Sequence, residues 1–257
     1  MTGRFASTVA LYEKLRPPYP PLFFREVAAR LPLTKTHALI DLGTGPGLLA
    51  LGFAPYVGHV TGVDPEPGMI AAAREAAARG AQALTLIEGK AETLADDIGR
   101  FDVVTIGRAL HWMDRDAVLA RLDRLVAPGG AILVCASFSA RDGRNVWLDD
   151  YNTTRRAWSN ARLLSEAGGG ERTHRDLAEF FRGTRFHVTE VITVETSHDV
   201  GMGDLARRVL TFSSSSPQAL GDKADAMLRD VEARLIPFSR DGRIDEIVMS
   251  SAQVIRG

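Results

Sequence analysis

The stretch Asp41-Leu42-Gly43-Thr44-Gly45-Pro46-Gly47 (DLGTGPG) decides the fold of this chain. It ends the compact apolar run 38–42, which is typical of a buried strand, and precedes residues 48–54, where the sequence predicts a short helix. Three glycines at alternate positions between a strand and a helix let a ligand approach the backbone closely. We therefore expect a strand, a ligand-binding loop and a helix in this order.

The loop differs from the dinucleotide-binding pattern G-x-G-x-x-G, because Leu48 stands where the third glycine is needed. Asp41 places a negative charge where a pyrophosphate would be repelled, and Pro46 lacks an N–H that a phosphate-binding helix start uses. An acid at this place fits a ligand that carries positive charge, such as S-adenosyl-L-methionine with its sulfonium and ammonium groups. An NAD(P)-dependent oxidoreductase is the alternative that these features count against.

A second acid, Asp64, follows the next predicted strand, residues 59–63, and stands 23 residues after Asp41. A carboxylate at this position of a doubly wound sheet accepts hydrogen bonds from both ribose hydroxyls of a nucleoside. The plainer interpretation is a helix N-cap before Pro65. The glycine loop and Asp64 together favour a nucleoside site.

Strand and helix patterns alternate through the first half of the chain, which predicts a parallel sheet with right-handed crossovers. The second half has a polar, helical stretch without a strand signal, then two late strands separated by helices. The further strands are expected at 84–88, 101–106, 131–136, 186–196 and 244–255, and the helical segments at 66–79, 115–126, 141–182, 203–212 and 217–235.

Five motifs in this order and spacing resemble the class I S-adenosylmethionine-dependent methyltransferases, in particular the small-molecule group that includes ubiquinone C-methyltransferases and trans-aconitate methyltransferase. They are DLGTGPG (41–47), GVDPEPGMI (62–70), GKAETL (89–94), FDVVTIGRALHW (101–112) and LVAPGG (125–130). The resemblance implies an α/β fold, a doubly wound Rossmann-like sheet of seven strands whose last strand is antiparallel, with a helical substrate cap.

Within one domain, this family pattern divides the chain into three parts. Residues 1–37 are expected to form an N-terminal arm and helix over the cofactor site, 38–140 the S-adenosylmethionine-binding core, and 141–257 the cap insertions and the two C-terminal strands.

The resemblance also implies roles residue by residue. Asp41 and the loop glycines would cradle the methionine half of the cofactor, Asp64 its ribose, and Met69 the adenine. The expected cofactor-binding residues are Asp41, Gly43, Gly45, Gly47, Asp64, Met69, Ala91, Glu92, Gly107 and Arg108. The plainer interpretation is helix packing for Met69 and a solvated carboxylate for Glu92.

The N-terminal arm matches a pattern that recurs in the same group, Tyr12 followed by Arg16-Pro17-Pro18-Tyr19-Pro20. Arg16 is expected to pair with the cofactor carboxylate in a charge-assisted bond, and Tyr12 to join it at the cofactor site. Tyr19 is expected to contact the substrate. The alternative is a proline-rich strap that only connects two helices.

Methyl transfer from a sulfonium is an in-line displacement with a good leaving group, so the protein mainly supplies alignment and a dry pocket. His111 is the candidate general base, because an imidazole titrates near neutrality. Trp112, Trp147 and Tyr151 are candidates for substrate contact, and packing within the cap is the alternative for the last two. No metal site is expected.

Composition limits the partners. Of 257 residues, 31 are Lys or Arg and 32 are Asp or Glu, so a net charge of -1 argues against a nucleic-acid substrate. The single cysteine, Cys135, excludes an internal disulfide. Without a visible targeting or membrane segment, we expect a cytoplasmic monomer or homodimer that acts on a small, planar or lipophilic acceptor and releases S-adenosyl-L-homocysteine. A further alternative is a protein that binds S-adenosylmethionine without catalysing methyl transfer.

Overall fold

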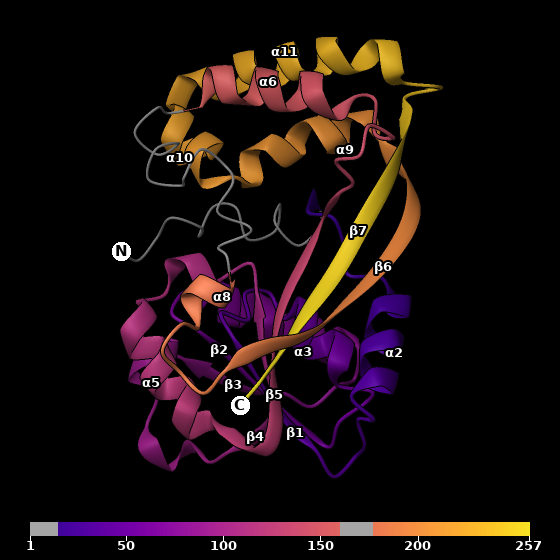
Figure 1. Cartoon of the computed structure of the whole chain (residues 1–257). Helices are drawn as coiled ribbons and strands as arrows, with labels where there is room; N and C mark the ends of the chain where they lie inside the picture. The colour runs from indigo at the N-terminus through magenta and orange to yellow at the C-terminus, as the bar shows by residue number, and fades with distance from the viewer. Residues whose placement is uncertain (1–14, 160–176) are drawn as a thin grey trace.

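Seven strands form one mixed sheet in the order β3-β2-β1-β4-β5-β7-β6 (Figure 1). The computed structural model describes residues 15–159 and 177–257, so the predicted contact at Tyr12 lies outside the described residues. β7 runs antiparallel to both β5 and β6, and the other neighbours pair in parallel, which confirms the predicted topology. The strands are β1 (Ala38–Leu42), β2 (His59–Asp64), β3 (Thr85–Glu88), β4 (Phe101–Gly107), β5 (Val126–Ser139), β6 (His187–Gly201) and β7 (Arg243–Arg256).

Helices follow the parallel strands and a second group forms a cap. Those against the sheet are α2 (Pro21–Arg30), α3 (Leu48–Phe53), α4 (Pro67–Arg79), α5 (Arg115–Leu125) and α8 (Leu177–Phe180), and those of the cap are α6 (Leu148–Trp158), α9 (Met202–Arg207), α10 (Pro217–Leu220) and α11 (Ala224–Leu235). The 3-10 turns are η1 (Ala91–Thr93), η2 (Asp96–Ile98), η3 (Leu110–Trp112), η6 (Arg208–Thr211), η7 (Ser213–Ser215), η8 (Gly221–Lys223) and η9 (Ile236–Phe238).

Most predicted elements lie within two residues of the observed ones, with four differences. Of the helical stretch expected over 141–182, the described residues form α6 and α8, and residues 141–147 are not helical. β5 and β6 are longer than expected, starting at Val126 and ending at Gly201 respectively. The helix expected over 217–235 is divided, because Gly221 adopts a left-handed φ of 55° after α10. A left-handed residue ends an α-helix, and glycine takes this conformation without a steric cost.

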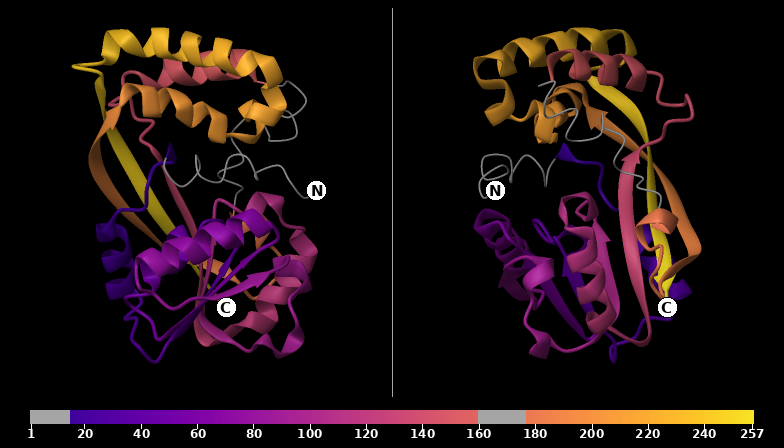
Figure 2. Two further views of the ribbon diagram at one scale, coloured as in Figure 1. Left: turned by 180° about the vertical axis from the view of Figure 1, so that it is seen from behind. Right: turned by 60° about the vertical axis from the view of Figure 1, so that its left-hand side comes forward.

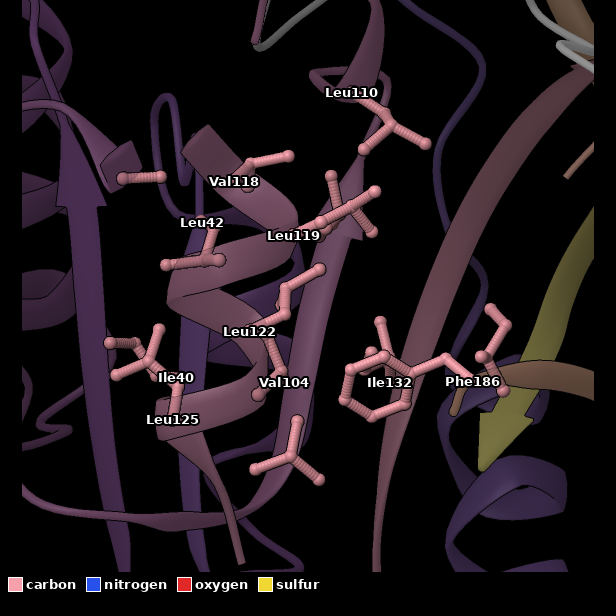
Figure 3. Packing of buried hydrophobic residues seen from close by; sticks show 14 of the residues in the cluster. Ile40, Leu42, Val104, Leu110, Val118, Leu119, Leu122, Leu125, Ile132 and Phe186 are labelled. Atoms are coloured by element: carbon pink, nitrogen blue, oxygen red, sulfur yellow. The ribbon is translucent and has the colours of Figure 1, made fainter. Parts of the chain in front are cut away.

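Alternation along β1 divides the apolar residues between the two faces of the sheet. Ile40 and Leu42 join Val104 and residues of α5 such as Leu122 in one buried cluster (Figure 3). Leu39 points to the opposite face, into a second cluster with the phenylalanines of α2 and with Phe53 of α3. Successive side chains of a strand point to opposite faces, so one short apolar run contributes to both cores.

The cap lies over the carboxyl end of the parallel strands, on the extensions of β5, β6 and β7 (Figures 1 and 2). It has a separate apolar core in which Trp147 and Tyr151 pack edge to face, with ring centroids 5.6 Å apart, against residues such as Leu205, Met227 and Val231. No helix among the described residues is long and apolar enough to cross a membrane.

A buried ion pair joins the cap to the sheet. The Arg208 guanidinium at the start of η6 donates from Nη1 and Nη2 to the two carboxylate oxygens of Glu246 on β7, at 2.6 and 2.8 Å. The Ser139 hydroxyl donates to the same carboxylate at 2.6 Å, and Arg208 Nε donates to the carbonyl oxygen of Leu15 at 2.5 Å. Because Glu246 is only 1% exposed, this carboxylate depends on its hydrogen bonds in place of water.

We expect Glu246→Gln to lower the free energy of unfolding by about 3 kcal/mol, since it leaves the buried Arg208 charge without its counter-charge. Glu190→Gln is the matched control, because Glu190 on β6 pairs with Arg30 at the surface and an exposed pair contributes less than about 1 kcal/mol. Chemical denaturation measures both. Equal effects of the two variants would contradict the account of the cap junction.

Candidate functional site

Backbone hydrogen bonds hold the loop after β1 against the end of β2. The N–H groups of Gly43 and Thr44 both donate to the carbonyl oxygen of Val63, at 2.8 and 2.9 Å. Gly43, Gly45 and Gly47 have left-handed φ angles of 72°, 55° and 88°, a region in which a Cβ is strained. The turn therefore requires glycine at these three positions.

Two of the expected glycines also permit close approach between loops. A Cβ at Gly43 would stand 2.4 Å from the Cβ of Ala109, and a Cβ at Gly107 would stand 2.6 Å from Cδ1 of Leu49. The loop after β1 thus contacts the loop after β4, and α3 contacts the end of β4, because no side chain separates them.

Asp41 ends β1 with its carboxylate held by hydroxyl groups. Thr44 Oγ1 donates to Oδ2 and Thr105 Oγ1 donates to Oδ1, both at 2.7 Å. Burial raises the pKa of Asp41 to about 6 against these lowering hydrogen bonds. At neutral pH the loop thus borders a buried negative charge, in surroundings that favour a cationic ligand.

Asp64 stands at the end of β2 and is held by the backbone on both sides. Gly45 N donates to Oδ2 and Glu66 N donates to Oδ1, each at 2.9 Å. Burial raises the pKa of Asp64, and the two backbone hydrogen bonds lower it. Each carboxylate oxygen keeps a further lone pair, so Asp64 is able to accept hydroxyl donors in addition.

A cavity of about 360 Å³ opens between the ends of β1, β2 and β4. Eleven predicted residues line it, nine of them expected at the cofactor and two at the substrate: Asp41, Gly43, Gly45, Asp64, Met69, Ala91, Glu92, Gly107 and Arg108, with Tyr19 and Trp112. Residues that the predictions did not assign are Thr44, Pro46, Leu48, Leu49, Pro65, Glu66, Lys90, Ala109 and Met113. Most of them are neighbours of assigned residues within the same motifs, so a contiguous reading of each motif finds them.

Three predicted residues, Gly47, His111 and Arg16, do not line the cavity. Gly47 is the N-cap of α3, and a Cβ there would contact Ala73 and Leu51 at 3.4 Å. His111 lies in η3 with its ring centroid 4.8 Å from that of Trp112. Arg16 reaches away to the cap, where Nη2 donates to the Thr211 carbonyl oxygen at 2.8 Å. Whether any of them contacts a ligand stays a prediction.

Trp147 and Tyr151 lie in the apolar core of the cap and do not line this cavity. Packing within the cap is the alternative to substrate contact that we gave for both residues from the sequence. Trp147 donates from Nε1 to the carbonyl oxygen of Asp245 at 3.1 Å, so its polar group already has a partner within the fold.

Arg108 fixes the strap of residues 15–20 against the cavity. It adopts a left-handed φ of 56°, and its Nη2 donates to the carbonyl oxygens of Pro17 and Ser137 at 2.6 and 2.8 Å. Its guanidinium carbon lies 5.1 Å from the ring centroid of Tyr19, and the Ser137 hydroxyl donates to the Pro18 carbonyl oxygen at 2.7 Å. The strap thereby places Tyr19 in the cavity wall.

The arrangement suits a nucleoside that carries positive charge. A carboxylate with spare lone pairs, a second buried carboxylate and a largely apolar wall come together at the carboxyl ends of adjacent strands, where doubly wound sheets bind ligands. Among the described residues, no group of three or more His, Cys, Asp or Glu side chains is placed to hold a metal ion.

Comparison with known proteins agrees with the fold and the motifs. Solved structures share the whole architecture, among them a protein described as a type II methyltransferase from Anaeromyxobacter dehalogenans (TM-score 0.63, 21% identity, 93% of this chain and 96% of that one). An S-adenosylmethionine-dependent methyltransferase from Thiobacillus denitrificans, in complex with S-adenosyl-L-homocysteine, matches over the full length of both chains (TM-score 0.53, 15% identity). The fold is thus the Rossmann-like fold of these methyltransferases.

Sequence similarity to methyltransferases is found mainly over the first half of the chain. Residues 39–130 match the family model of a methyltransferase domain. An uncharacterized methyltransferase of Mycobacterium tuberculosis is 32% identical over 148 residues, 58% of this chain and 57% of the relative. A ubiquinone biosynthesis O-methyltransferase of Azorhizobium caulinodans is 36% identical over 97 residues, 37% of this chain and 38% of that one. Residues 39–130 are therefore similar in sequence to methyltransferase domains.

The chain spans somewhat more than half the length of the first curated relatives it matches. A [4+2]-cyclase also shares the architecture, with a TM-score of 0.57 at 17% identity over 97% of this chain and 93% of that one. Since one fold serves different reactions, the activity has to be argued from the site.

The raised pKa of Asp41 predicts a pH dependence of stability with a definite sign. The folded protein holds the Asp41 proton up to about pH 6, whereas an ordinary Asp releases it near 3.8, so the free energy of unfolding falls as pH rises between these values. Asp41→Asn removes this contribution, so its stability relative to wild type should increase from pH 4 to about pH 6 and then stay constant.

Denaturation of the ligand-free proteins at each pH measures this difference, and Asp116→Asn on the exposed first turn of α5 controls for the loss of one carboxylate. A stability difference for Asp41→Asn that stays flat or decreases over this range would contradict the assignment.

Proposed function

We propose that this protein transfers a methyl group from S-adenosyl-L-methionine to an oxygen, nitrogen or carbon atom of a small-molecule acceptor, by in-line displacement. The observation that carries the proposal is the cavity in which the glycine loop, the buried Asp41 and the carboxylate of Asp64 meet. Each feature corresponds to one part of this cofactor.

The side chains of the cavity fit the cofactor part by part. Asp64 would accept the ribose hydroxyls with its remaining lone pairs, as acids at the second strand of nucleoside-binding sheets do. The Asp41 charge lies beside the loop and favours the positive sulfonium and ammonium groups. Met69 and Ala91, both buried in the wall, offer apolar surface to the adenine.

The cofactor, when bound, supplies an activated methyl group on a positively charged leaving group. The work of the protein is then to align the acceptor and to exclude water. Trp112 is 48% exposed and Met113 lies next to it in the cavity wall, so the face open to an acceptor is partly aromatic and apolar. This supports an acceptor with a planar or lipophilic part.

Calorimetric titration tests the proposal directly. We expect S-adenosyl-L-methionine and S-adenosyl-L-homocysteine to bind with Kd values in the range of about 1–100 μM, of the order of usual enzyme–ligand affinities. Asp64→Ala should weaken both by at least about a hundredfold, since it removes charge-assisted hydrogen bonds to the ribose and the anchor of Gly45.

Glu75→Ala is the control for this titration, because Glu75 lies on the exposed side of α4. NADH is the negative probe. Binding of NADH in place of either S-adenosyl compound would replace the proposal by a nicotinamide-dependent activity. Absence of binding by all three would leave no support for the cavity as a cofactor site.

His111 is our proposed general base for acceptors that lose a proton. Because its ring does not line the cavity, His111→Gln should leave the Kd of S-adenosyl-L-homocysteine unchanged and lower kcat by about a hundredfold at neutral pH. The pH profile of kcat should lose its acidic limb. A variant with wild-type kcat and pH profile would show that the acceptor needs no base at this position.

A further inference from the structure

A group of arginines lies between the cap and the strap, outside the cofactor cavity. We call Arg16, Arg155 and Arg208 the arginine cluster; Arg155 and Arg208 are buried at 4% and 6% exposure, and Arg16 is half-buried. The Phe212 ring holds two of them together, with the guanidinium carbons of Arg16 and Arg155 at 4.1 and 4.3 Å from its centroid. Three segments far apart in the sequence thus bring positive charge to one place.

The arginines differ in how their charge is balanced. Glu246 pairs with Arg208 through two hydrogen bonds, as described above. Arg155 forms neither a hydrogen bond nor an ion pair through its side chain with any residue in the described ranges, and its Nε is fully buried without an acceptor. A buried donor without a partner costs free energy that a bound acceptor would recover.

Tyr151 adds a second buried donor without a partner. Its hydroxyl has no hydrogen-bond partner among the described residues, and the side chain is 3% exposed. Burial raises the pKa of Tyr151 to about 12, although the nearby Arg208, Arg155 and Arg16 lower it, so the phenol keeps its proton at neutral pH. Burial also lowers the pKa of Arg155. Three of the charges that act on Tyr151 are positive, and the carboxylate that opposes them, Glu246, is already paired with Arg208.

Both donors belong to the same face of one helix. Tyr151 and Arg155 are four residues apart on α6 and so lie one turn apart on its buried side. A guanidinium and a phenol at this spacing match the several lone pairs of a carboxylate or phosphate, and arginine is the residue that recognises such oxyanions best.

The strap connects this place to the cofactor cavity. At one end, Arg16 and Leu15 bond to Thr211 and Arg208 of the cap, and at the other end Tyr19 lines the cavity. Three residue steps separate Arg16 from Tyr19, which is at most about 11 Å of extended chain. The backbone of the strap thus brings a member of the arginine cluster and a residue of the cavity wall within about 11 Å of each other.

We propose that Arg155 and Tyr151 bind an oxyanion of the acceptor, a carboxylate or a phosphate, and hold the acceptor by the end remote from the atom that receives the methyl group. The inference rests on the proposed function and narrows its substrate class to small acids. Because neither side chain lines the cofactor cavity, the oxyanion is an anchor and stays unmethylated.

Binding of small probes to the full chain, loaded with S-adenosyl-L-homocysteine, tests this inference. Benzoate and phenyl phosphate are the two anionic probes, and benzamide is the neutral probe of the same shape. We expect at least one anion to bind and benzamide to bind at least about tenfold more weakly, since loss of one charged partner is worth at least that factor. If only benzoate binds, the anchor is a carboxylate. If only phenyl phosphate binds, the anchor is a phosphate.

Variants of α6 separate binding from folding. Arg155→Gln and Tyr151→Phe should each weaken the anion at least about tenfold, and leave the Kd of S-adenosyl-L-homocysteine unchanged. Arg156→Gln is the matched control, because Arg156 is the adjacent, exposed arginine of the same helix and should bind as wild type does. Tyr151→Phe removes a hydroxyl that has no partner, so it should not lower the Tm of the free protein even where Arg155→Gln does.

Two results would overturn the inference. The first is that neither anion binds to protein that binds S-adenosyl-L-homocysteine, which leaves the proposed function intact. The second is that Tyr151→Phe and Arg155→Gln both bind the anion as tightly as wild type. Failure of S-adenosyl-L-homocysteine itself to bind is seen in the separate cofactor titration and overturns the proposed function together with this inference.

Discussion

The site depends on one set of hydrogen bonds, which joins the loop after β1 to the end of β2. Val63 accepts two N–H groups from the loop, and Asp64, the next residue, accepts the N–H of Gly45. These hydrogen bonds hold the loop beside the acid with which, in our proposal, it shares the ligand. The loop crosses the end of β2 because Gly43 and Gly45 adopt positive φ angles. The fold and the cavity therefore both require glycine at these two positions.

The second constraint is the free-energy cost of burying charged side chains at the junction between the cap and the sheet. Burying Arg208 is tolerable because Glu246 and the Leu15 carbonyl oxygen satisfy its donors. Burying Arg155 without an acceptor is not explained by the packing of the cap, since an apolar residue would fill the same place at lower cost. Functional sites are where such unfavourable arrangements persist, and this one lies beside the strap that borders the cavity.

Much of the core could be predicted from sequence because its signals are local. The apolar run before Gly43 predicted the first strand and the loop, and the resemblance to the methyltransferase motifs predicted most of the cavity wall. The extensions of β5 and β6 could not be predicted, because β5 starts with a segment that contains Pro128-Gly129-Gly130, which is typical of a loop, and β6 ends with the polar residues Ser197, His198 and Asp199. The arginine cluster was missed for a similar reason: Arg155 reads as an exposed helix charge until the fold brings distant segments to it.

A crystal structure with S-adenosyl-L-homocysteine would show which residues of the cavity hold the cofactor. We expect the ribose hydroxyls to lie on the Asp64 carboxylate, the amino-acid part against the loop of Gly43 to Gly47, and the sulfur toward the side of the cavity near Trp112. A ligand bound elsewhere, or a ribose that leaves Asp64 with its backbone partners alone, would contradict this expectation.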